Sequence, residues 1–166
     1  MPQASVLPLT NDKQAIQQRI NEMQPQGSTA GHLGTAWAWF ALSPNFSSVW
    51  PSANTPASYS MLTELNDSGQ PKLQKIAVLM TDGEYNEYYS GSNSSTQARA
   101  LCENMKAKGI IVYTVGFELS SRSTARKTLK KCATSSEHFY DADDAAALKL
   151  AFRDIALKIS TLRLAQ

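Results

Sequence analysis

Asp82 is a candidate for chemistry because it directly follows an apolar run. Residues 76–80 read Ile-Ala-Val-Leu-Met, and Thr81 and Asp82 come next. A run without alternating polar residues is typical of a strand covered on both faces, as in a parallel sheet. Parallel sheets bind ligands beyond the carboxyl ends of their strands, which is where this aspartate is expected. Asp82 is therefore a candidate cation ligand, and the alternative is that it only caps the following loop.

Hydroxyl groups that could join Asp82 occur in the segment QGSTAG, residues 26–31. A hard cation such as Mg²⁺ prefers oxygen ligands in octahedral geometry and keeps several waters. Ser28 and Thr29 lie in a glycine-flanked turn just before a predicted helix, so either hydroxyl could point toward a metal. The alternative is ordinary capping of that helix, which needs no metal.

The predicted elements that position these residues alternate regularly from residue 75 onward. Strands are predicted over 76–81, 110–117 and 137–143, and helices over about 95–108, 122–133 and 144–163. This βαβαβα order predicts an α/β domain of three layers with a mainly parallel sheet.

The first 74 residues are less regular. Residues 5–9 are a candidate short strand, with Pro8 favouring an edge position. The segment 10–27 predicts a helix with an apolar stripe of Ile16, Ile20 and Met23, and 28–44 predicts a second helix. Residues 45–74, rich in Pro, Ser and Asn, predict a long surface loop with one helical turn near residues 61–65.

Composition limits the class of protein. The 166 residues are 42% hydrophobic with a net charge of +2, which fits one globular domain. The densest basic segment, residues 121–131, has no interleaved aromatic residues, so nucleic-acid binding has little support. No apolar stretch approaches the roughly 18 residues of a membrane span. Since residues 1–13 lack the layout of a signal peptide, the chain is either cytosolic or a piece of a longer exported protein.

Several segments together resemble a known family. The segments are GSTAGHLGTAWAWFALSP, LMTDGE, ALCENMKAKGIIVYTVGFE, LKKCATSSEHFYDADDAAALKLAF and the terminal ISTLRLAQ. Together they resemble the later part of a von Willebrand factor A (vWA) domain. More narrowly, they resemble the vWA region of TadG-like proteins of the bacterial Tad/Flp pilus assembly system. The resemblance covers residues 6–166 and implies a three-layer, Rossmann-like sandwich in a single, partial vWA domain.

The resemblance also implies a metal-ion-dependent adhesion site, built from a D-x-S-x-S motif, a threonine and an aspartate. Carried over by motif, the threonine is Thr29 and the aspartate is Asp82. The sequence contains no D-x-S-x-S, and the segment NDSGQ at 66–70 has the wrong spacing. We expect the motif and its strand upstream of residue 1. The prediction is a partial, weak site with no tightly bound cofactor in this chain and Mg²⁺ in the full-length protein.

Three tyrosines follow Asp82, and in the fold implied by the resemblance they would stand on the rim of the metal face. Tyr85, Tyr88 and Tyr89 suit recognition of a protein partner because each has a rigid apolar ring with a polar tip. The alternative is that they pack on their own loop.

The two cysteines are candidates for a disulfide. Cys102 lies on the apolar face of one predicted helix and Cys132 at the end of the next, and helices flanking one strand can pack side by side. Such a bond would contribute about 3–4 kcal/mol in the chain-entropy model, but only in an oxidising compartment. This agrees with the extracytoplasmic location that the resemblance implies. The alternative is two buried thiols.

The histidines do not suggest a metal or catalytic site. The spacing of His32 and His138 from the cysteines does not indicate zinc. A pairing of Cys132 with His138 lacks a third, orienting group. Both histidines are therefore expected to be structural.

The last predicted helix has two apolar rows. One row, expected to face the sheet, consists of Leu148, Phe152, Ile155, Ile159 and Leu162. The other row, Leu150, Leu157 and Leu164, repeats every seven residues on the opposite side and is a candidate partner-binding surface.

The preferred interpretation is an extracytoplasmic protein-binding or adhesion module that is not an enzyme. Its partner would be a protein, such as another pilus assembly or surface protein, and its parent would be membrane-anchored. The alternative is a Mg²⁺-dependent phosphoryl-transfer or hydrolase domain using Asp82, although a second carboxylate at suggestive spacing is missing. Without the D-x-S-x-S strand, the edge of strand 76–81 would be bare. We expect either strand 5–9 to pair there or two chains to form a homodimer.

Overall fold

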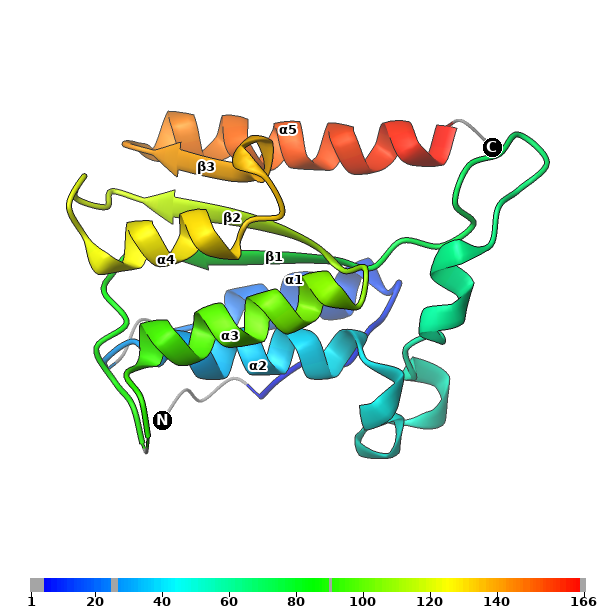
Figure 1. Ribbon diagram of the computed structural model, residues 1–166, viewed down its shortest axis with the longest axis horizontal. Helices are drawn as coiled ribbons and strands as arrows, with labels where there is room; N and C mark the ends of the chain where they lie inside the picture. Colours follow the sequence, from blue (N-terminus) through cyan, green and yellow to red (C-terminus); the bar gives the residue numbers. More distant parts are fainter. Residues whose placement is uncertain (1–4, 25–26, 90, 165–166) are drawn as a thin grey trace.

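A parallel sheet with helices on both faces forms the centre of the molecule (Figure 1). The computed structural model describes residues 5–24, 27–89 and 91–164, and residues 161–164 by their backbone only. The helices and strands in chain order are α1 (Lys13–Asn21), α2 (Gly31–Leu42), β1 (Ile76–Thr81), α3 (Ser94–Ala107), β2 (Ile111–Phe117), α4 (Thr124–Cys132), β3 (Phe139–Ala142) and α5 (Ala145–Leu164).

The strands are arranged in the order β1-β2-β3, and both pairings are parallel. Residue Ile76 of β1 is in register with Ile111 of β2, and Thr114 of β2 is in register with Phe139 of β3. The central strand β2 is buried almost along its full length, as its β-branched and aromatic composition requires. The predicted α/β fold with parallel strands is confirmed.

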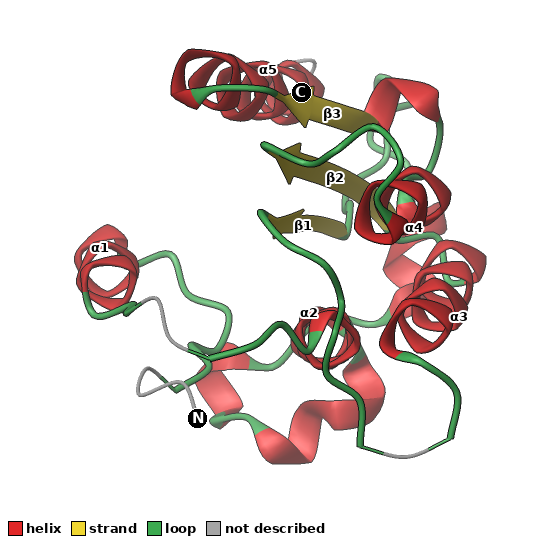
Figure 2. Ribbon diagram, turned by 90° about the vertical axis from the view of Figure 1, so that its left-hand side faces the viewer, coloured by secondary structure: helices red, strands yellow, loops and turns green. Residues whose placement is uncertain are grey.

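One face of the sheet packs against α2, α3 and α4 (Figure 2). Its buried apolar cluster comprises Ala77, Leu79, Cys102, Met105, Ile110, Val112 and Cys132. The helices begin where local chemistry allows: the Asn93 side chain accepts a hydrogen bond from the Thr96 amide (2.9 Å) to start α3. Gly109, at a φ of 78°, follows its C-terminal end.

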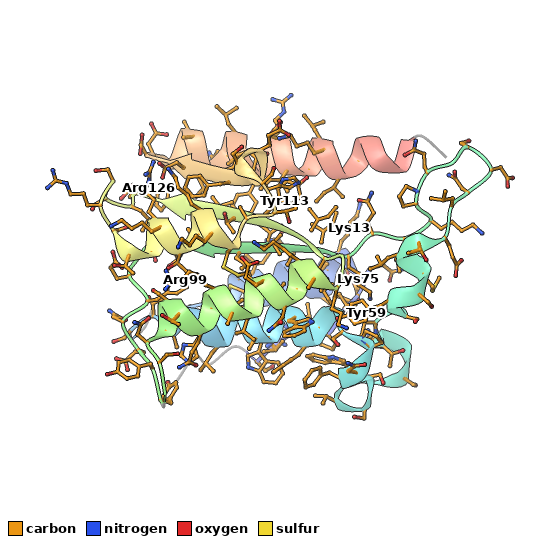
Figure 3. All side chains as sticks on the ribbon, viewed as in Figure 1. Lys13, Tyr59, Lys75, Arg99, Tyr113 and Arg126 are labelled. Atoms are coloured by element: carbon orange, nitrogen blue, oxygen red, sulfur yellow. A yellow bond between two sulfur atoms is a disulfide. The ribbon has the colours of Figure 1, made fainter. Side chains whose placement is uncertain are left out.

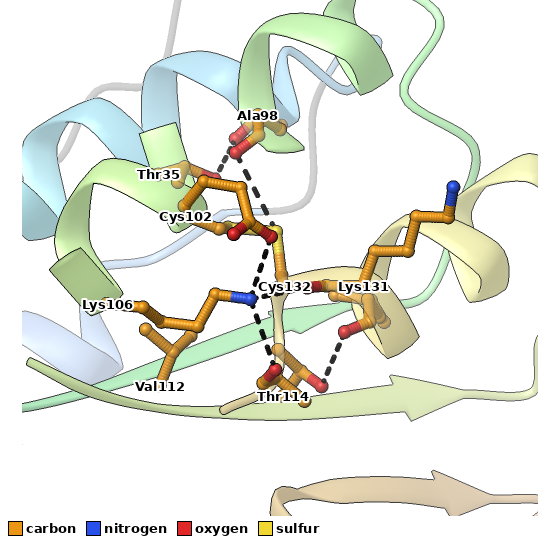
Figure 4. Close-up of a disulfide and its surroundings, with 12 residues drawn as sticks. Thr35, Ala98, Cys102, Lys106, Val112, Thr114, Lys131 and Cys132 are labelled. Atoms are coloured by element: carbon orange, nitrogen blue, oxygen red, sulfur yellow. Dashed lines mark hydrogen bonds and ion pairs between the residues drawn. A yellow bond between two sulfur atoms is a disulfide. The ribbon is translucent and has the colours of Figure 1, made fainter. Parts of the chain in front are cut away.

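Cys102 and Cys132 form a disulfide that joins α3 to α4 within this cluster (Figure 4). Both sulfur-bearing residues are buried, and their Cα atoms are 5.0 Å apart. The predicted pairing is therefore present, and the alternative of two thiols is wrong.

The opposite face of the sheet packs against α5. Leu148, Ile155 and Ile159 face the strands, as predicted. Phe152 does not, since 42% of it is exposed. The row facing the sheet runs instead through Ala151, which is 6% exposed, so Phe152 lies on the flank of α5. The side chain of Leu162 lies outside the described residues.

The predicted strand at residues 5–9 is wrong. These residues have no regular secondary structure, and they do not pair with β1. Helix α1 follows, capped by the Asp12 carboxylate, which accepts from the Gln14 amide (2.8 Å). The predicted stripe of Ile16, Ile20 and Met23 remains exposed, because α1 stands apart from the sheet (Figure 2).

The segment 45–74 is more ordered than a plain loop. Together with Pro44 it forms three short 3₁₀ helices, Pro44–Val49, Ser52–Asn54 and Tyr59–Thr63. Tyr59 anchors it by accepting a hydrogen bond from the Trp39 indole (3.0 Å). The buried Lys75 ammonium lies 5.4 Å from the centre of the Tyr59 ring and donates to the Leu42 carbonyl (2.8 Å) (Figure 3). Burial lowers the pKa of Lys75.

Among the helices described, none combines the length and the apolar character that crossing a membrane requires.

Candidate functional site

The carboxyl end of β1 places Asp82 on the surface. Thr81 closes a tight turn, since its hydroxyl donates to the Gly83 carbonyl (3.0 Å) and also accepts from the Gly83 amide (3.3 Å). This turn ends the strand one residue before Asp82, which is exposed. The aspartate therefore lies at the strand end, as the apolar run predicts.

The loop that contains Thr29 is held against the loop after β1. The Thr29 amide donates to the Asn86 side-chain oxygen (2.9 Å), and the Glu87 amide donates to the Thr29 carbonyl (3.1 Å). The Thr29 hydroxyl oxygen lies 3.7 Å from the position a Cβ would take at Gly83. Two segments more than fifty residues apart in the chain thus meet where Asp82 is exposed.

Asp82 and Thr29 are the two oxygen donors that the sequence predicts for a cation at this place. Asp82 supplies a carboxylate and Thr29 a hydroxyl, whereas an octahedral ion needs six oxygens. Within the described part of the chain, no group of three or more His, Cys, Asp or Glu residues could hold a metal ion.

Glu84, the nearest other carboxylate in sequence, is engaged elsewhere. One of its oxygens accepts from the Thr124 amide and the other from the Ala125 amide, both at 3.0 Å. It therefore caps the beginning of α4 from a separate segment, together with the local cap Ser123. Sequence reasoning missed Glu84 and Asn86, because both act on backbone groups that are distant along the chain.

The three tyrosines after Asp82 have different positions. Tyr85 is half-buried, and its ring lies against Gly31 at the start of α2. Burial raises the pKa of Tyr85 to about 12. Tyr88 and Tyr89 are 58% and 73% exposed, so these two stand outward in the way that recognition requires.

Both histidines take part in local packing. The His32 Nδ1 lies 2.7 Å from the buried Ser94 hydroxyl and thereby links α2 to α3. His138 Nδ1 lies 2.8 Å from the Ser135 hydroxyl, and its ring packs 4.6 Å from the Tyr113 ring. Burial lowers the pKa of His138, and the positive charge of Lys158 adds to this effect.

The outer row of α5 is exposed where it is described. Leu150 and Leu157 are 64% and 55% exposed, and the side chain of Leu164 lies outside the described residues. Helix α5 covers the face of the sheet opposite α3 and α4, as Figure 2 shows.

A groove of about 340 Å³ runs beside β1 and reaches the site. Strand residues 78–81 form one wall, and α2 with the loop before it forms the other. Thr29 and Tyr85, from the two loops that meet after β1, also line the groove.

Comparisons with known proteins agree with this architecture. The family model described as von Willebrand factor type A domain matches residues 52–154. Among solved structures, the pilus adhesin SpaC from Lactobacillus rhamnosus GG is similar with a TM-score of 0.56 and 15% identity, over 88% of this chain and 21% of that one. Proximal thread matrix protein 1 from the mussel byssus is similar with a TM-score of 0.51 and 21% identity, over 95% and 32%.

The chain thus spans about a fifth to a third of the solved structures it matches. At these identities the structural similarity indicates the fold. No curated protein matches the chain by sequence.

Proposed function

The chain belongs to the von Willebrand factor type A family, and on that premise we propose that it is an extracytoplasmic, non-enzymatic protein-binding module of the adhesion type. The observation that carries this proposal is the meeting of two loops after the carboxyl end of β1, in a segment where Asp82, Tyr88 and Tyr89 are each exposed. Exposed tyrosines beside a carboxylate form a surface suited to a protein partner. The adhesin among the structural neighbours supports the same class of function.

An extracytoplasmic location is supported by the disulfide. The bond between Cys102 and Cys132 persists in an oxidising compartment and is rare in a reducing one. Segments spread over residues 6–166 resemble TadG-like proteins, so we assign the module to the Tad/Flp type of pilus assembly, in a membrane-anchored parent. Its partners are then other pilus assembly or surface proteins.

The proposal includes only a weak Mg²⁺ site at this surface. Asp82 and Thr29 hold Mg²⁺ only weakly, because the described residues offer no group of three or more His, Cys, Asp or Glu that could hold a metal ion. Calorimetric titration with Mg²⁺ should give a dissociation constant no tighter than about millimolar, the range of weak extracellular cation sites. A micromolar constant that disappears in Asp82→Asn would overturn this part.

Photo-crosslinking tests the recognition surface. A photoreactive amino acid placed at Tyr88 should give a discrete adduct with a protein of the producing cell's envelope. The same group at exposed Lys127 on α4 serves as the matched control. The adduct should be lost in the Asp82→Ala/Tyr89→Ala background. Equal adducts at both positions would contradict the surface assignment.

Leu150 and Leu157 on α5 form a second candidate docking surface, because both are exposed apolar side chains on one side of the helix. A photoreactive group at Leu150 tests it in the same experiment. An adduct there but not at Tyr88 would move the recognition surface to α5.

The enzymatic alternative is tested separately. A phosphoryl-transfer domain using Asp82 would hydrolyse a generic phosphomonoester in the presence of Mg²⁺. We expect no turnover above that of Asp82→Asn, and Asp82-dependent turnover would replace the adhesion proposal.

A further inference from the structure

A long run of the sequence has no charged residue. Residues 23–63 contain no Asp, Glu, Lys or Arg, although 18% of the chain is charged, and all three tryptophans lie within this run. A surface built from it lacks the charges that would attract an anionic or a cationic partner.

One side of α2 presents part of this run to solvent. Leu33, Trp37 and Phe40 are spaced four and three residues apart, so they share one side of the helix. Another side of α2, with Trp39 and Leu42, packs against the buried cluster under the sheet. Leu33 and Trp37 are therefore exposed.

The 3₁₀ helix Pro44–Val49 extends this surface on the side of the molecule remote from α5 (Figure 1). The centre of the Phe46 ring lies 4.0 Å from that of Phe40, and the centre of the Trp50 ring lies 6.1 Å from that of Trp37. These rings and their apolar neighbours form an aromatic patch, which consists of Leu33, Trp37, Phe40, Phe46, Val49 and Trp50.

The indole N–H groups of the three tryptophans differ. That of Trp50 donates to the Phe40 carbonyl (3.0 Å), and that of Trp39 donates to the Tyr59 hydroxyl (3.0 Å). Among the described residues, none accepts a hydrogen bond from the exposed indole of Trp37. Trp37 therefore offers an aromatic ring and a free donor, and its near-perpendicular contact with Phe40 (77° between the rings) holds it in place.

The polar groups beside the rings restrict the occupant. Positions three apart in a 3₁₀ helix share a side, so Asn45 and Ser48 stand together, and both are exposed. In the described part of the chain, their side chains have no hydrogen-bond partner. Insertion into lipid would remove water from this amide and hydroxyl without replacing its hydrogen bonds, which is costly. An occupant with hydroxyl groups of its own would replace them.

We propose that the aromatic patch binds a neutral polysaccharide whose sugar rings are joined by equatorial bonds, as in cellulose and chitin. Such rings present flat faces of C–H groups, whose partial positive charge matches the negative face of an aromatic ring. The sugar hydroxyls bond to the Asn45 and Ser48 side chains and accept from the Trp37 indole N–H. Since neither partner is charged, the binding is insensitive to salt.

Titration of the isotope-labelled full chain with cellohexaose, followed by nuclear magnetic resonance, tests the proposal. The indole N–H resonance of Trp37 should shift saturably, with half-saturation below about 1 mM, and added salt should not change it. The resonances of Trp39 and Trp50 are internal references and should move less, because their N–H groups are already bonded within the protein. Maltohexaose, whose axial linkages bend a chain of the same sugar, should bind at least about tenfold more weakly.

Two variants remove the patch in different ways, and retention on cellulose powder compares them. Trp37→Ala deletes the central ring. Val49→Glu places a charge on an exposed side chain of the patch, and it decides the matter if Trp37→Ala fails to fold. Retention should fall at least about tenfold in both. Leu65→Glu, the same kind of change at an exposed residue outside the patch, should be retained like the parent protein.

Three results would overturn the proposal. One is an unchanged Trp37 resonance at the highest soluble concentration of cellohexaose, another is equal affinity for maltohexaose, and the third is retention that survives Val49→Glu. A shift caused by phosphatidylcholine vesicles and not by cellohexaose would assign the patch to a membrane surface instead. A shift caused by raising the protein concentration, with a dimer in light scattering, would assign it to a second copy.

The proposed recognition surface at the end of β1 is tested independently of this patch. Asp82→Asn and Tyr88→Ala should leave the response to cellohexaose intact. The photo-crosslink from position 88 should in turn survive Val49→Glu, so either proposal can fail without the other.

Discussion

The ring of Tyr85 occupies the space that a side chain at Gly31 would need. A Cβ built at Gly31 would overlap the Tyr85 ring carbons, so only glycine permits this contact. The contact fixes the loop after β1 against the beginning of α2, next to the hydrogen bonds between Thr29 and Asn86. The candidate recognition surface therefore depends on a close approach between residues 54 positions apart, since 85 − 31 = 54.

Replacing Gly31 should destabilise the protein by this steric route. Gly31→Ala should lower the free energy of unfolding by about 1–3 kcal/mol, the usual cost of overpacking. The matched control is Gly34→Ala in the same helix, where the new methyl meets open space. That control should raise stability by up to about 1 kcal/mol, because alanine is the better helix former. Urea unfolding measures both, and equal effects would contradict the assigned contact.

Tyr85 should make the free energy of unfolding depend on pH above the ordinary pKa of a tyrosine. Burial raises its pKa from 10.0 to about 12, so the neutral phenol is favoured in the folded state. The resulting stabilisation is complete below pH 10 and is lost as pH rises from 10 to about 12. Tyr85→Phe should show a smaller loss of stability across this window. Absorbance titration at the tyrosinate band should lack one late-titrating group in the variant, and identical titrations would refute the assignment.

Glu84 should stabilise the fold rather than bind a partner or metal. Glu84→Ala removes both acceptors for the Thr124 and Ala125 amides and should cost about 0.5–2 kcal/mol, the range for a lost helix cap. Glu87→Ala, at a neighbouring exposed glutamate, should change stability by less than about 0.5 kcal/mol. Thermal unfolding of the two variants makes the comparison. A larger effect at Glu87 would be inconsistent with the capping role.

Reduction of the disulfide should weaken the packing of α3 against α4. The bond closes a loop with a sequence separation of 30, for which the chain-entropy model gives about 3–4 kcal/mol. Urea unfolding with and without reductant measures the loss. A Cys102→Ala/Cys132→Ala variant should be insensitive to reductant, and a wild-type protein equally insensitive would mean that the bond does not form in solution.

Much of the fold could be predicted from local sequence patterns. The apolar run at 76–80, the β-branched run at 110–117 and the helical spacing of Ala98, Cys102 and Met105 each specify an element within a few residues. Asp82 at a strand end follows from the same patterns. Cys102 and Cys132 lie on the two consecutive helices that precede and follow β2, so their pairing was also foreseeable.

The helix propensity and stripe of α1 are local properties, and the sequence alone determined that this helix forms. The partner of its apolar face is not local, and only the tertiary structure shows Ile16, Ile20 and Met23 exposed. The same holds for the three tyrosines, which are alike in sequence. Tyr85 is half-buried because Gly31, which has no side chain, leaves room for its ring, whereas Tyr88 and Tyr89 are exposed.

The sequence by itself therefore determined the order of elements from residue 75 onward, the position of Asp82 and the candidate disulfide, because hydrophobic period, caps and turns act between near neighbours. The tertiary structure alone decided that Glu84 caps α4 and that Ala151 rather than Phe152 of α5 faces the sheet. It also decided that β1 borders a groove whose lining has no charged residues. These outcomes depend on which distant surfaces meet and on the shape they leave between them, and no local pattern encodes that.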